Sequence, residues 1–281
     1  MPRSAGALLA ALVLGTLVAA QAPDAVTLRD QLDAYLLAYE PKLSTLLADE
    51  EMTQRMQEGY GGRRVTHRRI RSEVAFIALP GDAGWLGFRR VVKVNDKAIK
   101  DHGVPLGQLM AEGASDDYDQ ARLLLADSAA HNLGAPRTIN LPNLPLELLH
   151  PRNRHRFAQE LAGREKIRGV QTVVLRLDEF ATPTVIQQAN GGDMKTVVWA
   201  WVEPESGRLL RANVNARDAR FGLRQFSAVI RVDFKEVPAL DLLVPSEMKE
   251  TFFVERNSQG TGTAKYTNYR RFQTAARILP Q

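Results

Sequence analysis

Short β-prone segments separated by turn signals fill the second half of the chain, and this pattern limits the fold most. Between residues 156 and 274 these segments are interrupted at 162–163, 204–207, 237–238 and 257–260, where Gly, Pro, Asn or Ser occurs. Parallel neighbours need a crossover of about a dozen residues or more, so strands joined this closely must be antiparallel. The predicted strands are 156–161, 170–179, 196–203, 208–216, 225–236, 246–254 and 262–274.

The first half of the chain opens with a predicted helix. Apolar residues at helical spacing indicate an amphipathic helix over 28–40, with Thr27 as its N-cap and Pro41 as its end. Residues 43–56 that follow fit a helix and an alternating strand equally well.

Strands and helices alternate after that segment. Period-two patterns predict strands over 67–79 and 85–94, and Asn95-Asp96 indicates the tight turn of a hairpin. Helices are then predicted over 117–133, which ends at a glycine, and over 144–149, which lies between two prolines.

The first 22 residues have the features of an export signal. Arg3 provides a positive end, the apolar run Ala7–Ala20 follows, and Ala22 is a small residue at the expected cleavage point. The run is shorter than the roughly 20 residues that a transmembrane helix needs, and no cysteine is present to carry a lipid. We therefore expect a cleaved signal peptide over 1–22 and an exported chain, periplasmic or extracellular, without a transmembrane segment.

Composition limits the class further. The absence of cysteine excludes disulfides, thiolate metal sites and cysteine nucleophiles. A chain that is 44% hydrophobic and 25% charged is typical of a globular protein. Because no linker or internal repeat interrupts residues 23–281, we expect a single α+β domain.

The positive charge admits more than one explanation. The net charge is +5 and the isoelectric point is near 9.5, but the basic residues are dispersed and alternate with apolar ones, as on a solvated strand face. Exported proteins rarely meet nucleic acid, so no nucleic-acid partner is expected. Attraction to anionic lipid headgroups or acidic partners stays open beside a simple gain in solubility, which we favour.

Motifs for catalysis or metal binding do not stand out. The five histidines lack the spacing of a metal site, and no serine lies in a strand-to-helix elbow. A helix N-terminus accounts for Asp116, Asp117 and Asp119, and the adjacent Asp178 and Glu179 point to opposite faces of a strand. We therefore predict no catalytic residue, no metal and no cofactor.

The most apolar predicted strand reads TVVWAWV over residues 196–202. Trp199 and Trp201 share one face with Val197, and the even-numbered residues occupy the other. A strand that is apolar on both faces is covered on both. It belongs either to the packed core or to the wall of an apolar ligand cavity, and core is favoured because packed interiors outnumber cavities.

Five stretches together carry a resemblance to known proteins. They are GWLGFR at 84–89 with VND at 94–96, TINLPNLPLELLHPRNRHRF at 138–157, VWAWVEPESGRLLR at 198–211, LVPSEM at 243–248 and AKYTNYRRF at 264–272. In these stretches the chain resembles a family of uncharacterised exported bacterial proteins over nearly all of residues 23–281. The resemblance implies no activity and no catalytic residue.

A looser resemblance covers mainly residues 156–274. A tryptophan-bearing strand, a Pro-x-x-Gly hairpin, a return strand, a Val-Pro pair and a terminal Tyr-x-x-Tyr-x-x-Phe pattern are similar to the periplasmic lipoprotein-carrier (LolA-like) fold. That fold implies an incomplete, strongly curved antiparallel barrel, with helices on its concave side and an apolar cavity for acyl chains. The chain differs in a helical insertion around residues 104–155, whose helices can fill such a cavity.

The patterns and the resemblance lead to one main hypothesis. We expect an α+β fold with a strongly curved antiparallel sheet, an incomplete β-barrel of about nine to eleven strands, and helices packed on its concave face. The function expected is a non-enzymatic binding or carrier protein for a hydrophobic ligand such as a lipid or acyl chain. The residues expected to bury the ligand are Phe76, Trp199, Trp201, Phe226 and Phe234. This burial would contribute about 25 cal/mol per Å² of apolar area.

Two alternatives belong to other functional classes. The first is a structural or interaction module of the cell envelope, with a filled core and an envelope protein as its partner. The second is an unrecognised hydrolase, for which His131, Asp127 and Glu179 are the candidates. A cavity large enough for a ligand favours the carrier, whereas a hydrolase needs a cleft in which a carboxylate meets a histidine.

Overall fold

The computed structural model describes residues 23–59, 63–78, 85–99, 105–111, 118–188, 190–218, 226–254 and 258–271. Several features predicted from the sequence lie outside these ranges. They are the signal peptide over 1–22, the acidic residues Asp116 and Asp117, and the side chain of Phe226. Within the described ranges, no helix has the length and apolar character that a membrane span requires.

Strands make up most of the fold, and helices cluster in its first half. The helices are α1 (Ala25–Leu43), α2 (Leu106–Ala111), α3 (Tyr118–Ala130) and α4 (Leu144–Leu149), with short 3-10 turns η2 (Pro151–Arg156) and η3 (Pro238–Leu240). The strands are β1 (Leu46–Glu58), β2 (Arg64–Ala78), β3 (Trp85–Val94), β4 (Lys97–Ala98), β5 (Phe157–Ile167), β6 (Val170–Glu179), β7 (Ile186–Gln187), β8 (Asp193–Val202), β9 (Leu209–Asp218), β10 (Phe226–Val237), β11 (Leu242–Val254) and β12 (Ser258–Arg271).

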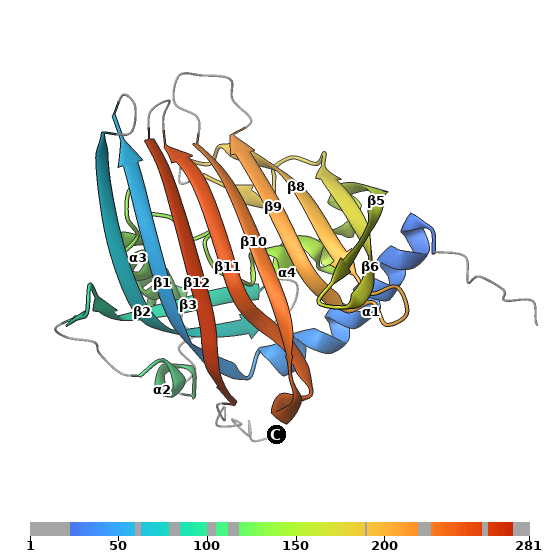
Figure 1. The fold of residues 1–281 in the computed structure, drawn as a ribbon, viewed down its shortest axis with the longest axis horizontal. Coiled ribbons are helices and arrows are strands. Elements are labelled where there is room, and N and C mark those ends of the chain that lie inside the picture. The colour runs from blue at the N-terminus through green and yellow to red at the C-terminus, as the bar shows by residue number, and fades with distance from the viewer. Residues whose placement is uncertain are drawn as a thin grey trace, which may run out of the picture.

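All twelve strands belong to one antiparallel sheet, in the order β4-β3-β2-β1-β12-β11-β10-β9-β8-β6-β5, with β7 beside β8. The sheet is open, because β4 and β5 end the order without pairing to each other. It bends so that β2 and β3 pass behind the central strands (Figure 1), but it is neither closed nor strongly curled. The antiparallel α+β class is thus confirmed, whereas the barrel-like closure implied by the resemblance is not seen.

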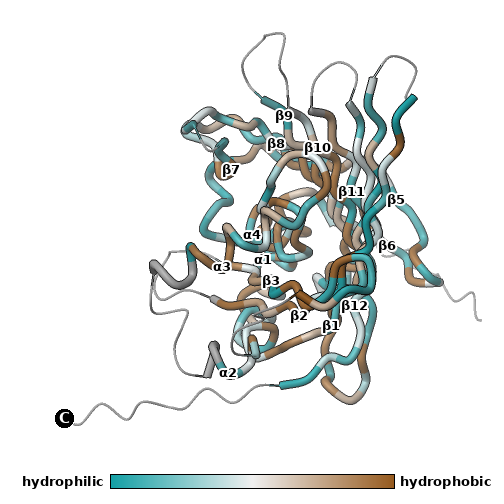
Figure 2. The backbone as a smooth tube through the Cα atoms, turned by 90° about the vertical axis from the view of Figure 1, so that its left-hand side faces the viewer, coloured by the Kyte–Doolittle hydropathy of each residue, from teal (hydrophilic) through white to brown (hydrophobic). Residues whose placement is uncertain are grey.

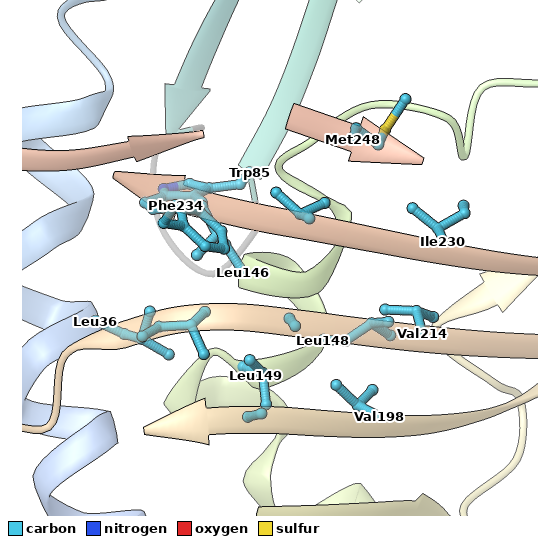
Figure 3. Close-up of a cluster of buried hydrophobic side chains, with 14 of the residues drawn as sticks. Leu36, Trp85, Leu146, Leu148, Leu149, Val198, Val214, Ile230, Phe234 and Met248 are labelled. Carbon is cyan, nitrogen blue, oxygen red and sulfur yellow. The ribbon is translucent and has the colours of Figure 1, made fainter. Parts of the chain in front are cut away.

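The two faces of the sheet are covered differently. We call the face that α1 and α4 cover the inner face and the opposite one the outer face; Figure 2 shows both helices on the same side of β10 and β11. Inner-face residues such as Val198, Val214 and Ile230 belong to one buried cluster with Leu148 and Leu36 of these helices, and Leu148 lies beside Val214 in Figure 3. The short α2 lies instead on the outer face at one corner of the sheet, where Leu106 joins the cluster of Leu47, Ala75 and Phe88.

Local chemistry explains the turns and caps. Asn95 and Asp96 both adopt positive φ, 48° and 64°, as a two-residue hairpin turn of type I′ requires. The first helix is capped by Asp24, whose Oδ1 accepts from the Thr27 backbone N–H at 2.8 Å. The Thr27 cap predicted from the sequence was therefore wrong, and the helix runs two residues beyond Pro41.

Tertiary pairing decided two segments that local pattern did not. Residues 46–58 form a strand because β2 and β12 pair with both of its edges, which overrides the helical spacing. The predicted turn at 162–163 was wrong: β5 continues through a bulge between Leu161 and Gly163, and the chain turns at Arg168 and Gly169, both with positive φ.

Candidate functional site

The inner face over β6, β8, β9 and β10 is an aliphatic layer, which we call the apolar region. On β8 the alternate residues Val198, Ala200 and Val202 point inward and are fully buried. Where the structure describes them, side chains of α1 and α4 fill the space above this layer, so the region is a packed core. The helical members are Leu28, Leu32, Leu36 and Leu43 of α1 and Leu146, Leu148 and Leu149 of α4.

Aromatic rings form a continuous series at one edge of the apolar region. The Tyr35 and Tyr39 rings stack at 5.3 Å, Tyr39 contacts the Trp85 ring at 6.0 Å, and Trp85 contacts the His150 ring at 6.5 Å between centroids. His150 Nε2 lies 2.9 Å from a carboxylate oxygen of Glu40. The series therefore connects α1 to β3 and to the end of α4.

A pocket of about 280 Å³ opens next to Trp85, between β3, α3 and the N-terminal end of α4. We call it the β3–α4 pocket. Trp85 and Asn143 belong to its lining, and their Nε1 and Oδ1 atoms are buried without a hydrogen-bond partner among the described residues. Gly87 also belongs to the lining, and a Cβ there would sit only 2.3 Å from Asn143 Oδ1. The remaining lining is mainly apolar and includes Leu86, Leu125, Ile139, Leu141, Leu144, Val185 and Ile186.

A second pocket, of about 170 Å³, lies on the other side of the aromatic series, between α1 and the β10–β11 hairpin. Tyr39 and Tyr35 form its floor, and Lys42, Arg208 and Glu236 contribute charged side chains. Burial raises the pKa of the Tyr35 hydroxyl, although the nearby Arg208 charge opposes the shift. Tyr39 is the more deeply buried of the two, and its hydroxyl has no partner among the described residues. The Tyr39–Trp85 contact thus lies between two small pockets.

The inner face over β1, β3, β11 and β12 differs, because charged groups are buried there. Arg89 Nε and Nη2 donate to the Glu50 carboxylate at 2.6 and 2.8 Å, and both side chains are nearly inaccessible. Arg137 makes a second bidentate pair with Glu250, at 3.1 and 2.5 Å. Such pairs carry a large desolvation cost that only good geometry and further hydrogen bonds offset.

Amides complete this polar region and bind the segment 132–141 to the strands. Asn132 Oδ1 accepts from Asn140 Nδ2 at 2.7 Å and from Gln54 Nε2 at 2.8 Å. The Asn140 carbonyl accepts from Arg89 at 2.7 Å, and the Tyr266 hydroxyl donates to Glu50 at 2.9 Å. We call this connected set the polar network.

The surroundings in the polar network fix the protonation states of Arg89 and Tyr266. Burial by itself would lower the pKa of Arg89, but the adjacent Glu50 carboxylate outweighs it and the pKa is raised. Burial raises the pKa of Tyr266 well above its usual value, and the Glu50 charge adds to the shift. Arg89 therefore stays a cation and Tyr266 a neutral hydrogen-bond donor across the physiological range.

The ligand-binding residues predicted from the sequence do not share one surface. Phe76 and Phe234 are about 1% exposed and belong to the same inner-face core, with Phe234 near Leu146 and Trp85 in Figure 3. Trp199 and Trp201 lie on the outer face and are half-buried. There the Arg176 guanidinium lies over the Trp199 ring at 5.9 Å.

Of the three hydrolase candidates, the described residues bring only His131 and Asp127 together, without Glu179. His131 Nε2 lies 3.5 Å from Asp127 one turn earlier, at the end of α3. Glu179 is bound elsewhere, where it accepts from the Thr196 hydroxyl at 2.6 Å and from the Val185 backbone N–H at 2.7 Å. Within the same ranges, no group of three His, Asp or Glu side chains is placed to hold a metal ion.

Sequence reasoning missed Trp85, Tyr39 and the polar network. A signal for the network was present: Glu50 and Gln54 occur on the same parity as Met52 and Met56 of a strand whose other inward residues are apolar. A charged residue at such a position indicates a buried partner elsewhere in the chain. The aromatic contact left no comparable signal, because it joins residues from distant elements.

Comparisons with known proteins found resemblance only at the level of structure. No family model matches the chain, and no curated protein matches it. A DUF1329 family protein from Desulfovibrio piger aligns over 92% of this chain and 96% of its own, with 11% identity and a TM-score of 0.42. A putative outer membrane lipoprotein-sorting protein domain from Vibrio parahaemolyticus aligns over 88% and 93%, with 12% identity and a TM-score of 0.42. A LolA superfamily protein from Nitrosomonas europaea aligns over 92% and 99%, with 11% identity and a TM-score of 0.37.

Proposed function

We propose that this protein is an envelope binding or carrier protein for a hydrophobic ligand, a lipid or an acyl chain, which it takes up through the β3–α4 pocket. The observation that carries the proposal is the composition of that pocket. Its lining is largely apolar, and two of the lining residues carry a buried polar atom, Trp85 Nε1 and Asn143 Oδ1, without a partner among the described residues. Buried polar groups are normally satisfied, so each unpaired one needs an explanation. An ester or carboxylate group of the ligand would accept from the Trp85 N–H.

The volume of the β3–α4 pocket limits how much of a ligand fits without movement of the helices. Ligand sites usually measure about 300–1,000 Å³, and the β3–α4 pocket is slightly smaller than that range. A longer chain therefore needs α4 and α1 to move, after which it would replace their side chains against Phe76 and Phe234. In this proposal the two helices cover the inner face of the bent, open sheet and move aside to admit the ligand.

Aliphatic packing suits such an exchange. Each methylene moved from water into an apolar site contributes about 0.8 kcal/mol. The displaced leucines and the incoming chain make contacts of the same kind, without fixed direction. Export through the predicted signal at residues 1–22 would place the protein where such ligands pass between membranes.

Titration with a fluorescent fatty acid, cis-parinaric acid, tests the proposal. Leu125→Trp fills the β3–α4 pocket, because Leu125 lines it, and we expect it to weaken binding at least tenfold. Leu123→Trp is the matched control, since Leu123 lies two residues away on α3 and is 68% exposed. Absence of binding to the unmodified protein, or equal loss in both variants, would argue against this site.

One observation favours an envelope interaction module as the second candidate. Strand β5 ends the sheet with most of its residues exposed, and a free edge can pair with a strand of another protein. The bulge at Leu161–Gly163 and the charges of Arg164 and Lys166 work against such pairing. A lipid-free protein that captures a specific envelope partner through β5 would favour this function over the carrier.

A further inference from the structure

The outer face of the sheet carries a regular basic surface. Its side chains form rows of cross-strand partners over seven neighbouring strands, from β8 through β12 and β1 to β2. Three consecutive rows run from Lys195 to Val65, from Val197 to His67 and from Trp199 to Arg69, and no position in them holds Asp or Glu. We call these rows the basic surface. Its cations are Arg55, Arg69, Lys195, Arg217, Arg231 and Lys249.

Acidic residues appear in the next row, from Trp201 to Arg71, and beyond the ends of the rows, at Asp178 on β6 and at Asp96 after β3. Three cations of the basic surface have carboxylate partners. Arg231 lies 2.9 Å from Asp233, Lys249 lies 2.8 Å from Glu247 and Arg69 lies 3.2 Å from Asp96. The carboxylates therefore lie around the border of the basic surface and not within its rows.

Three other cations lack a carboxylate partner among the described residues. Lys195 Nζ donates to the Phe180 carbonyl at 3.3 Å, and Arg217 Nε donates to the Asn215 side chain at 3.3 Å. These two cations lie directly opposite each other on β8 and β9, an arrangement that costs stability in the free protein. Arg55 on β1 has no ion pair in the part of the chain that the structure describes. No carboxylate among the described residues therefore pairs with these three positive side chains.

Apolar side chains lie in the same rows and are open to solvent. Phe253 is 40% exposed and Val65 is 41% exposed, and both belong to the first row. Trp199 begins the third row. Helices α1 and α4 lie on the opposite face, behind the central strands in Figure 1. Tryptophan and phenylalanine beside basic residues are the combination that the headgroup layer of a bilayer accommodates.

We propose that the basic surface docks the protein on a bilayer that contains anionic phospholipid. At about 4.8 Å per strand, the rows span about 30 Å. The charge is therefore spread over a broad face and not gathered in a groove, which suits the continuous field of a membrane better than one acidic peptide. The function proposed above is not required for this inference, since the basic surface and the β3–α4 pocket share no residue.

Vesicle sedimentation with the full exported chain tests the proposal. The probes are vesicles of phosphatidylcholine alone and of phosphatidylcholine with about 30 mol% phosphatidylglycerol, whose anionic headgroups give a negative surface potential of tens of millivolts. We expect binding to the anionic vesicles only, and release at high salt because exposed charges are screened. Each cation near such a surface contributes about a fivefold change in partitioning. The partition coefficient of the variant Arg55→Gln/Lys195→Gln/Arg217→Gln on anionic vesicles is therefore expected to fall on the order of 100-fold.

The matched control removes the same charge elsewhere. Arg164→Gln/Lys166→Gln/Lys235→Gln changes exposed cations outside the basic surface and is expected to keep most of the binding. A fluorescence measurement adds an independent readout: brominated lipids should quench the unmodified protein but not Trp199→Phe/Trp201→Phe, whose remaining Trp85 is buried.

Three results would overturn the proposal. They are equal binding to neutral and anionic vesicles, equal loss in the two triple variants, and retention on heparin without vesicle binding. The last result would assign the basic surface to a soluble polyanion.

Discussion

The inner face of the sheet contains two regions that are equally buried but held together differently. The apolar region relies on aliphatic contacts of β8–β10 with α1 and α4, whereas the polar network uses two buried ion pairs and three amides. Aliphatic contacts have no fixed geometry, but a buried charge depends on one specific partner. The apolar region is thus suited to exchange its contents, and the polar network to hold the segment 132–141 in one place.

Breaking the polar network should give the largest effect on stability. Arg89→Leu leaves the Glu50 carboxylate buried without its bidentate partner, and removing one member of a buried pair costs about 3–5 kcal/mol. We expect the free energy of unfolding, measured by urea denaturation, to fall by that amount.

A double variant separates charge from packing in that experiment. Arg89→Leu/Glu50→Leu removes both charges, so it should recover a large part of the loss. If the double variant is as unstable as the single one, the shape of the two side chains matters more than their charge, and the contrast between the two regions fails.

A substitution in the apolar region should lower the free energy of unfolding somewhat less. Its effect should depend only on the volume of the side chain. Leu148 is fully buried on α4, so Leu148→Ala should lower the free energy of unfolding by about 2–4 kcal/mol. Leu148→Met keeps the volume and should cost less than about 1.5 kcal/mol. A methionine variant as unstable as the alanine variant would show that this region also demands a fixed geometry.

The outer face should show the smallest effect, and one that depends on pH. Burial by itself would raise the pKa of Asp233, but hydrogen bonds from Arg231 and Arg211 outweigh it and the pKa is lowered. Ionised Asp233 therefore adds stability above its unfolded pKa of about 3.9, and this is lost as the pH falls through the lower folded pKa.

Asp233→Asn measures that contribution. The free energy of unfolding of the unmodified protein should exceed that of the variant by on the order of 1 kcal/mol near pH 7. The effect is small because the arginine partners are partly exposed. The difference should shrink below about pH 4. A difference that is constant from pH 7 to pH 3 would mean that Asp233 acts through its shape and not its charge.

Several elements could be predicted closely from the sequence because local chemistry specifies them. Strands 85–94 and 170–179 and the helix 144–149 have the predicted bounds, since period-two alternation, prolines and turn residues act within a few positions. The candidate site could not be predicted in the same way. Trp85 and Tyr39 carry no local sign of their contact, and the outer position of Trp199 depends on which face the helices cover.

The sequence by itself determined the antiparallel class, the parity of side chains on each strand and the hairpin turn at Asn95 and Asp96. Only the tertiary structure decided that β1 pairs with β12, with Leu46 opposite Arg271, which joins the two halves of the chain into one sheet. The reason is physical: a hairpin is set by the few residues of its turn, whereas two free strand edges present the same backbone groups to any partner. Their choice depends on the burial of every side chain that the pairing brings together.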